Sequence, residues 1–167
     1  MTFVTRHAAL SDAAAACEVV RRSIVELCYE DHRGDEGTLA SWLANKTPAK
    51  FEQWIRSDEH IALVAERDNE LVGFALLNLQ GTLALLYVSP DARFNGISKA
   101  LLGALEEAAL AAGISEVRLE SSVTALRFYT GCGYTSTGPP CTGFGITSCY
   151  PMSRRIGTDS RHVVPSA

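Results

Sequence analysis

The residues with the clearest chemical potential lie in one junction, Tyr87 to Lys99, where an apolar run gives way to a loop and then to a helical pattern. The first turn of the predicted helix holds Gly96 and the small Ser98, and Arg93 adds a cation. Helix N-termini present unpaired N–H groups and a partial positive charge, so a phosphate group can bind there without a metal. The junction therefore predicts an anion site, with an ordinary strand-to-helix connection as the alternative. Neither G-x-G-x-x-G nor a P-loop occurs, which disfavours those nucleotide sites.

A second segment, Ser122 to Tyr134, has the pattern of a short helix with Phe128 facing inward and Gly133 as its C-cap. Taken alone, this pattern predicts that Tyr129 packs in the protein interior.

In this order and spacing, the two segments resemble the GNAT superfamily of acyl-coenzyme A-dependent N-acyltransferases. Arg93 to Ser98 matches the family's pyrophosphate loop, R/Q-x-x-G-x-G/A, with Ser in the last small position. Tyr87 to Pro90 matches its aromatic-Val strand entry, and Ala125 to Tyr134 matches its A-x-x-F-Y-x-x-x-G-F/Y motif. The matching region is Leu83 to Tyr134, whereas Tyr29 to Arg56 resembles nothing specific.

The resemblance implies an α+β fold: a mixed, mostly antiparallel central sheet flanked by helices, with a splayed central strand pair. It also implies direct transfer of an acetyl group from acetyl-CoA to a primary amine, with backbone N–H groups of the splayed strand stabilising the oxyanion. Tyr129 matches the family position of the general acid, and a phenol with a pKa of about 10 can protonate the leaving thiolate. No Cys has an evident His or Asp partner, so we expect no acyl-enzyme.

The coenzyme is expected along the splayed strand, the loop and the second motif. The implied cofactor-binding residues are Leu86, Tyr87, Val88, Arg93, Phe94, Asn95, Gly96, Ile97, Ser98, Lys99, Ser122 and Phe128. Ser122 stands where the family commonly has Asn, which shortens its reach to the pantetheine arm.

The general base is left open, because the predicted splayed strand Leu83–Val88 contains no Glu or Asp. The alternatives are a water chain and four residues of an acidic loop between positions 30 and 36, namely Glu30, Asp31, His32 and Asp35. That loop either attracts a cationic amine or is simply solvated.

Hydrophobic periodicity predicts the elements that position these residues. Strands are expected over Thr2–Ala8, Ile61–Glu66, Leu71–Leu79, Leu83–Val88, Glu116–Glu120 and Ile146–Met152, and helices over Ala13–Cys28, Thr38–Ala44, Pro48–Arg56, Ile97–Ala112 and Val123–Cys132. Regular βαβ alternation is missing, which favours a mixed α+β sheet over a doubly wound one.

Composition narrows the class of protein. With 167 residues, we expect one domain over residues 1–156 and a polar tail over 157–167. The net charge of −4 argues against nucleic-acid binding, and the apolar runs are too short for a membrane span. Five scattered Cys and no apolar signal sequence favour the cytoplasm, and the four His lack metal-ligand spacing, so no metal is expected.

Several alternatives stay open at this point. The acceptor is a small-molecule amine (a polyamine, an antibiotic or an amino acid) or a protein amine, and the acyl group can be longer than acetyl. Related domains often dimerise, so a homodimer is possible. The competing function is a non-catalytic acyl-CoA-binding or sensor module of the same fold.

Overall fold

The computed structural model describes residues 2–143 and 146–157. Its strands are β1 (Val4–His7), β2 (His60–Arg67), β3 (Glu70–Asn78), β4 (Leu83–Val88), β5 (Glu116–Ser121), β6 (Thr135–Ser136), β7 (Cys141–Gly143) and β8 (Ile146–Arg155). Its helices are α1 (Ala13–Leu27), α2 (Tyr29–His32), α3 (Glu36–Leu43), α4 (Pro48–Arg56), α5 (Ile97–Ala111) and α6 (Val123–Gly131), with single 3₁₀ turns at Leu10–Asp12 and Pro90–Ala92. From residue 158 onward, the expected polar tail lies outside the described residues.

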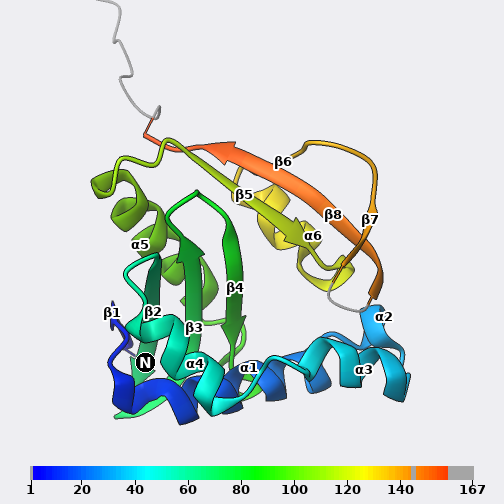
Figure 1. Ribbon diagram of the computed structural model, residues 1–167, viewed down its shortest axis with the longest axis horizontal. Coiled ribbons are helices and arrows are strands. Elements are labelled where there is room, and N and C mark those ends of the chain that lie inside the picture. The colour runs from blue at the N-terminus through cyan, green and yellow to red at the C-terminus, as the bar shows by residue number, and fades with distance from the viewer. Residues whose placement is uncertain (1, 144–145, 158–167) are drawn as a thin grey trace, which may run out of the picture.

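The strands form two sheets that lie side by side (Figure 1). One sheet has the antiparallel order β1-β2-β3-β4, and the other has the order β5-β8-β6 with β7 also pairing with β8. Helices α1 and α4 cover one face of the first sheet, and α5 covers the other. The expected α+β class, a mostly antiparallel sheet flanked by helices, is confirmed.

The two sheets are joined where β4 and β5 begin. Thr82 and Arg118 form an isolated parallel bridge, and the Arg118 N–H donates to the Gly81 carbonyl at 2.8 Å. The Arg118 guanidinium also donates to the Gln80 carbonyl at 2.7 Å. Beyond this point β4 pairs with β3 and β5 pairs with β8, so the two strands diverge (Figure 1). The expected splayed strand pair is therefore present.

A bulge in β4 adds to the divergence. The pairing of β3 with β4 runs in register up to Leu76 opposite Leu85, and then places Leu77 opposite Leu83. Ala84 is the extra residue. A bulge bends its strand and increases the local twist, which turns β4 away from a flat continuation into β5.

The core has one cluster on each face of the first sheet. Val20 and Ile24 of α1 are fully buried against Phe74 of β3. Leu101 and Leu105 of α5 are buried on the opposite face. Their spacing of four residues follows the helical repeat, which is why the sequence pattern located both helices.

The prediction of an acidic loop between positions 30 and 36 is wrong. Its first residues form the short helix α2, which ends at Arg33 in the left-handed conformation. Asp35 then caps α3, because its carboxylate accepts the Thr38 N–H at 2.7 Å. Polar composition suggested a loop, but capping residues make the segment helical. None of the described helices is long and apolar enough to cross a bilayer.

Gly81 is expected to be indispensable for the junction of the two sheets. Its φ is +90°, and a Cβ there would lie 2.6 Å from the backbone oxygen of Glu116. Gly81→Ala should therefore lower the free energy of unfolding by about 2–4 kcal/mol, measured by urea denaturation. Gly103→Ala is the matched control, because a Cβ on Gly103 meets nothing within 4 Å inside helix α5. It should stabilise the protein by about 0.5–1 kcal/mol, and equal losses in both variants would contradict the role of the junction.

Candidate functional site

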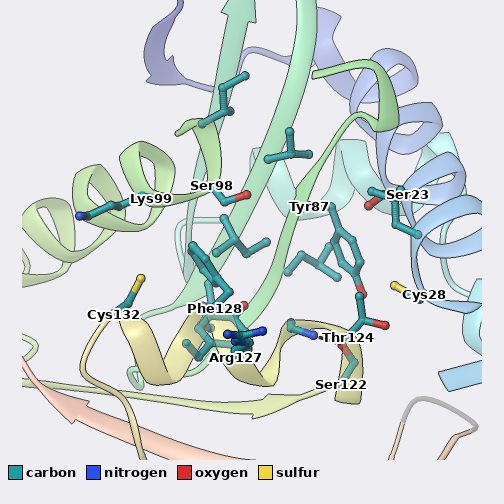
Figure 2. Close-up of a pocket in the computed structure, with 18 of the residues that line it drawn as sticks. Ser23, Cys28, Tyr87, Ser98, Lys99, Ser122, Thr124, Arg127, Phe128 and Cys132 are labelled. Carbon is teal, nitrogen blue, oxygen red and sulfur yellow. Dashed lines mark hydrogen bonds between the residues drawn. The ribbon is translucent and has the colours of Figure 1, made fainter. Parts of the chain in front are cut away.

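A cavity of about 570 Å³ opens where β4 and β5 diverge. Its walls come from β4, the start of α5, the end of β5 and helix α6, with side chains of α1 and α3 closing one end. Figure 2 shows Tyr87 and Ser98 on opposite sides of this space. The volume lies within the range of small-molecule and cofactor sites.

The loop before α5 has an unusual backbone that shapes one end of the cavity. Phe94 and Gly96 both have positive φ, +62° and +76°. The Asn95 side-chain amide donates to the carbonyls of Ala92 and Arg93, at 3.3 and 3.1 Å, and so holds the turn. The loop leads directly into the first turn of α5.

The N-terminus of α5 is available to an anion. The first intrahelical bond of the helix is the one from the Ala100 N–H to the Gly96 carbonyl, so the N–H groups of the first turn have no helical acceptor. Gly96, Ser98 and Lys99 line the cavity, and Arg93 lies at the same end. A Cβ on Gly96 would meet nothing within 4 Å, so glycine is required there for its backbone conformation. Backbone N–H groups, the helix dipole and the cations Arg93 and Lys99 are the features that suit an anion at this end of the cavity.

Tyr129 lies in the wall formed by α6. Its side chain is 7% exposed and its ring contacts those of Phe128 and Tyr134, with centroids 5.2 and 5.7 Å apart. Burial raises the pKa of Tyr129 well above its usual value. The phenol is therefore neutral and holds its proton in the free protein.

Neutral polar groups also occupy the end of the cavity near α1. Figure 2 shows Tyr87 of β4 directed toward the region of Cys28 and Thr124, with Ser23 beside it. Burial raises the pKa of Cys28 to about 12, and the nearby Asp31 charge adds to the effect. Burial likewise raises the pKa of Tyr87. The thiol and the phenol both stay protonated at neutral pH.

Three of the four candidate bases are engaged in structural hydrogen bonds. The Asp31 carboxylate accepts the N–H groups of Val123 and Thr124, at 2.7 and 3.2 Å, and the Thr124 hydroxyl at 2.6 Å. His32 is buried between the Gly34 N–H, which donates to its Nδ1 at 3.0 Å, and a backbone carbonyl near its Nε2.

The third engaged candidate is Asp35, the cap of α3. Glu30 is exposed, and none of the four candidates is among the described residues that line the cavity.

The structure brings nearly all the predicted cofactor-binding residues to this cavity. Those that line it are Leu86, Tyr87, Val88, Arg93, Phe94, Gly96, Ile97, Ser98, Lys99, Ser122 and Phe128, together with Tyr129. Asn95 is the exception, since its side chain braces the loop instead. The Ser122 hydroxyl oxygen caps α6 by accepting the Ala125 N–H at 3.2 Å.

Sequence reasoning missed several residues of the lining. Arg127 lies within the second motif, so attention to the motif's polar positions could have found it. Glu120 is the next-to-last residue of β5, just before that motif, and is the only carboxylate among the described lining residues. Ser23 comes from α1, and no local pattern connects it to the site.

Comparison with known proteins supports the interpretation of the two motifs. Residues 29–156 match the family model described as an acetyltransferase (GNAT) domain. Among curated protein sequences, none matches this chain significantly.

Solved structures share the whole architecture. A GCN5-related N-acetyltransferase from Rhodopseudomonas palustris, also described as a class II aminotransferase, is 26% identical with a TM-score of 0.81, over 93% of this chain and 97% of that one. The PaiA N-acetyltransferase from Thermoplasma acidophilum, solved with coenzyme A, is 25% identical with a TM-score of 0.77, over 93% and 99%. The putative acetyltransferase YncA from Salmonella typhimurium, solved with acetyl-CoA, shares the fold at 19% identity and a TM-score of 0.72, over 100% and 99%.

Asp31 is expected to act as a structural cap rather than as a base. Asp31→Ala removes the acceptor for three donors at the start of α6, so it should cost about 1–2 kcal/mol of stability. Glu30→Ala, a change at the neighbouring exposed carboxylate, should leave stability within about 0.5 kcal/mol of the wild type. Thermal unfolding of both variants checks the difference. A stable Asp31→Ala protein would contradict the capping role.

Proposed function

Because the chain belongs to the GNAT acetyltransferase family, we propose that it is an N-acetyltransferase that moves the acetyl group of acetyl-CoA to a primary amine. The observation that carries the proposal is the cavity between β4 and β5, which ends at the anion site on α5. Coenzyme A has a pyrophosphate followed by an extended pantetheine arm that ends in the thiol. The first suits the anion site on α5, and the second suits the cavity that continues from it.

The loop and β4 provide the binding surface for the coenzyme. Its pyrophosphate binds the N–H groups of the first turn of α5, with Arg93 and Lys99 adding positive charge. Its pantetheine arm lies along the edge of β4 near Leu86 and Val88, because the opposite edge is already paired with β3. Phe94 is 93% exposed beneath the Arg93 guanidinium, which lies 4.6 Å from the ring centroid, and this pair offers the adenine a stacking surface.

The reaction is a direct acyl transfer. The lone pair of the free amine forms the new C–N bond at the thioester carbonyl, and the C–S bond then breaks. N–H groups on the open edge of β4 stabilise the oxyanion. Tyr129 gives its phenolic proton to the departing sulfur, which leaves as the thiol. The nitrogen loses its excess proton to water, and the phenolate regains a proton from solvent.

Water is the proposed acceptor of the amine's own proton. Asp31, His32 and Asp35 are held in structural hydrogen bonds, and β4 has no carboxylate. Glu120 of β5 lines the cavity, but its two oxygens face the sulfurs of Cys141 and Cys149 at 3.8 and 3.7 Å. The acceptor therefore enters as its free base, by proton exchange with solvent in the open cavity. Hydroxyls of Ser23 and Tyr87 at the inner end suit a small primary amine.

Binding of acetyl-CoA tests the anion site. A ligand at a hundredfold excess over its Kd should add about 2.7 kcal/mol of stability, a rise of several degrees in Tm. Acetyl-CoA and desulfo-CoA should both produce this shift in thermal unfolding, and ATP should not. Gly96→Glu should abolish the shift by placing a negative side chain in the loop. Gly96→Ala introduces the same backbone strain without the charge, so it should retain most of the Tm shift that acetyl-CoA produces. A full shift in Gly96→Glu would show that the pyrophosphate lies elsewhere.

Tyr129→Phe tests the general acid. Loss of the proton donor should reduce kcat about 10²-fold while the Kd for acetyl-CoA changes little. Tyr134→Phe is the matched control, since that phenol donates to Glu106 at 2.8 Å and touches the Tyr129 ring. It should cost stability but leave kcat within a fewfold of the wild type. Unchanged turnover in Tyr129→Phe, measured by thiol release with a panel of amines, would remove Tyr129 from the mechanism.

The pH profile of kcat/KM follows from the two proton transfers. Below the pKa of the acceptor amine, kcat/KM should rise about tenfold per pH unit, because only the free base attacks. Since burial raises the pKa of Tyr129, the acid stays protonated and no decline should occur near pH 10, the usual value for a phenol. A decline at that pH which disappears in Tyr129→Phe would show that the phenol titrates normally.

A further inference from the structure

A cluster of three potential metal ligands lies on the second sheet, and one of the three, Glu120, also lines the cavity. Cys141, Cys149 and Glu120 come from the three strands β7, β8 and β5, and their ligand atoms all lie within 4.8 Å of one another. The sulfur atoms of the two cysteines are 3.1 Å apart. Each sulfur faces a different oxygen of the carboxylate, at 3.8 Å for Cys141 and 3.7 Å for Cys149.

The strand register explains this convergence. Cys141 lies directly opposite Cys149, and Glu120 lies directly opposite Pro151, two residues farther along β8. Side chains two residues apart on a strand share a face, and directly paired residues share it as well. All three groups are therefore fixed on one face of the sheet by backbone pairing rather than by mobile side chains alone.

We propose that Cys141, Cys149 and Glu120 bind a thiophilic divalent cation, of which zinc is the best fit. Zinc takes thiolate and carboxylate ligands in a tetrahedral arrangement, at about 2.3 Å to sulfur and about 2.0 Å to oxygen. Those bond lengths require about 3.5 Å between the bound oxygen and each sulfur. Each sulfur now lies 3.7–3.8 Å from a different oxygen of Glu120, and one oxygen lies within 4.8 Å of both sulfurs, so a rotation of the carboxylate would bring one oxygen to both. The two sulfurs would move apart by less than about 1 Å, which side-chain rotation can supply.

Among the residues that the structure describes, no fourth side chain joins this cluster of potential ligands. Cys149 is fully buried, whereas Cys141 is partly exposed and Glu120 is exposed, so solvent reaches the cluster from one side. Three protein ligands and an open position are typical of zinc sites that hold a water molecule or a further ligand. The site does not depend on the proposed acetyl transfer, although Glu120 also lines the cavity.

A cluster of Cys and Glu suits a cation better than it suits a redox pair. Thiolates are the reactive form of cysteine in disulfide exchange, and an adjacent carboxylate disfavours them. A bound cation instead brings two thiolates and the carboxylate together favourably. Sequence spacing did not reveal the site, because its ligands are 21 and 8 residues apart and two lie in a hairpin.

Direct metal binding by the reduced full-length protein tests the proposal. Titration with zinc chloride against a chromophoric chelator should show one equivalent bound, and cobalt(II) should give thiolate-to-metal charge-transfer absorption. Cys141→Ser should weaken binding by more than about a hundredfold, beyond the 10–100-fold typical of an outer-shell change. Cys132→Ser is the matched control, a partly buried thiol outside the cluster, and should bind as the wild type does.

Further variants separate the proposal from its alternatives. Glu120→Gln should weaken zinc binding at least about tenfold while keeping the cobalt charge-transfer bands, because both thiolates persist. Absence of stoichiometric zinc binding, or equal binding by Cys141→Ser and the wild type, would overturn the site. Closure of a Cys141–Cys149 disulfide by glutathione disulfide in the presence of saturating zinc would also overturn it, in favour of a redox pair.

Discussion

The site depends on one constraint: within the described part of the chain, the only backbone pairing between the β4 and β5 segments is at Thr82, just before β4, and Arg118, the third residue of β5. The bonds from Arg118 to Gly81 and Gln80 fix that junction. Past it, the edge of β4 that faces β5 carries backbone donors and acceptors that β5 does not pair, since β5 turns to β8. Backbone polar groups near a protein interior require partners. A ligand with alternating amide groups, such as a pantetheine arm, can supply them, so the proposed binding surface is the same edge that the divergence leaves unpaired.

The rest of the structure holds this gap open in a defined shape. On one side, α5 is packed on the first sheet with its N-terminus at the mouth of the cavity. On the other, Asp31 ties the short helix α2 to the start of α6, and so fixes the helix that carries Tyr129. Arg93 and Lys99 lie at the loop, and buried phenols and thiols line the end near α1, while Arg127 and Glu120 are the other charged residues of the described lining. A doubly charged pyrophosphate and an uncharged thioester match these two environments.

The parts predicted from sequence were those governed by local physics. The ends of Leu83–Val88 were correct because glycine and proline bound a continuous apolar run. The loop before α5 was likewise predicted from neighbouring residues, because its motif, Arg93 to Ser98, is contiguous in the sequence. Asp31 was considered as a base, yet its partners are 92 and 93 residues away, a relation that composition and periodicity do not contain. The same holds for Glu120, whose neighbours are set by the pairing of β5, β7 and β8.

The cysteines bear on whether the acyl group passes through the protein. A nucleophilic cysteine needs a lowered pKa, from a cation, a helix N-terminus or an adjacent base. The two thiols that line the cavity have the opposite environment, because burial raises the pKa of Cys28 to about 12 and also raises that of Cys132. Lys99 opposes the shift at Cys132 without reversing it. With both thiols neutral, direct attack by the amine is the route that these side chains support.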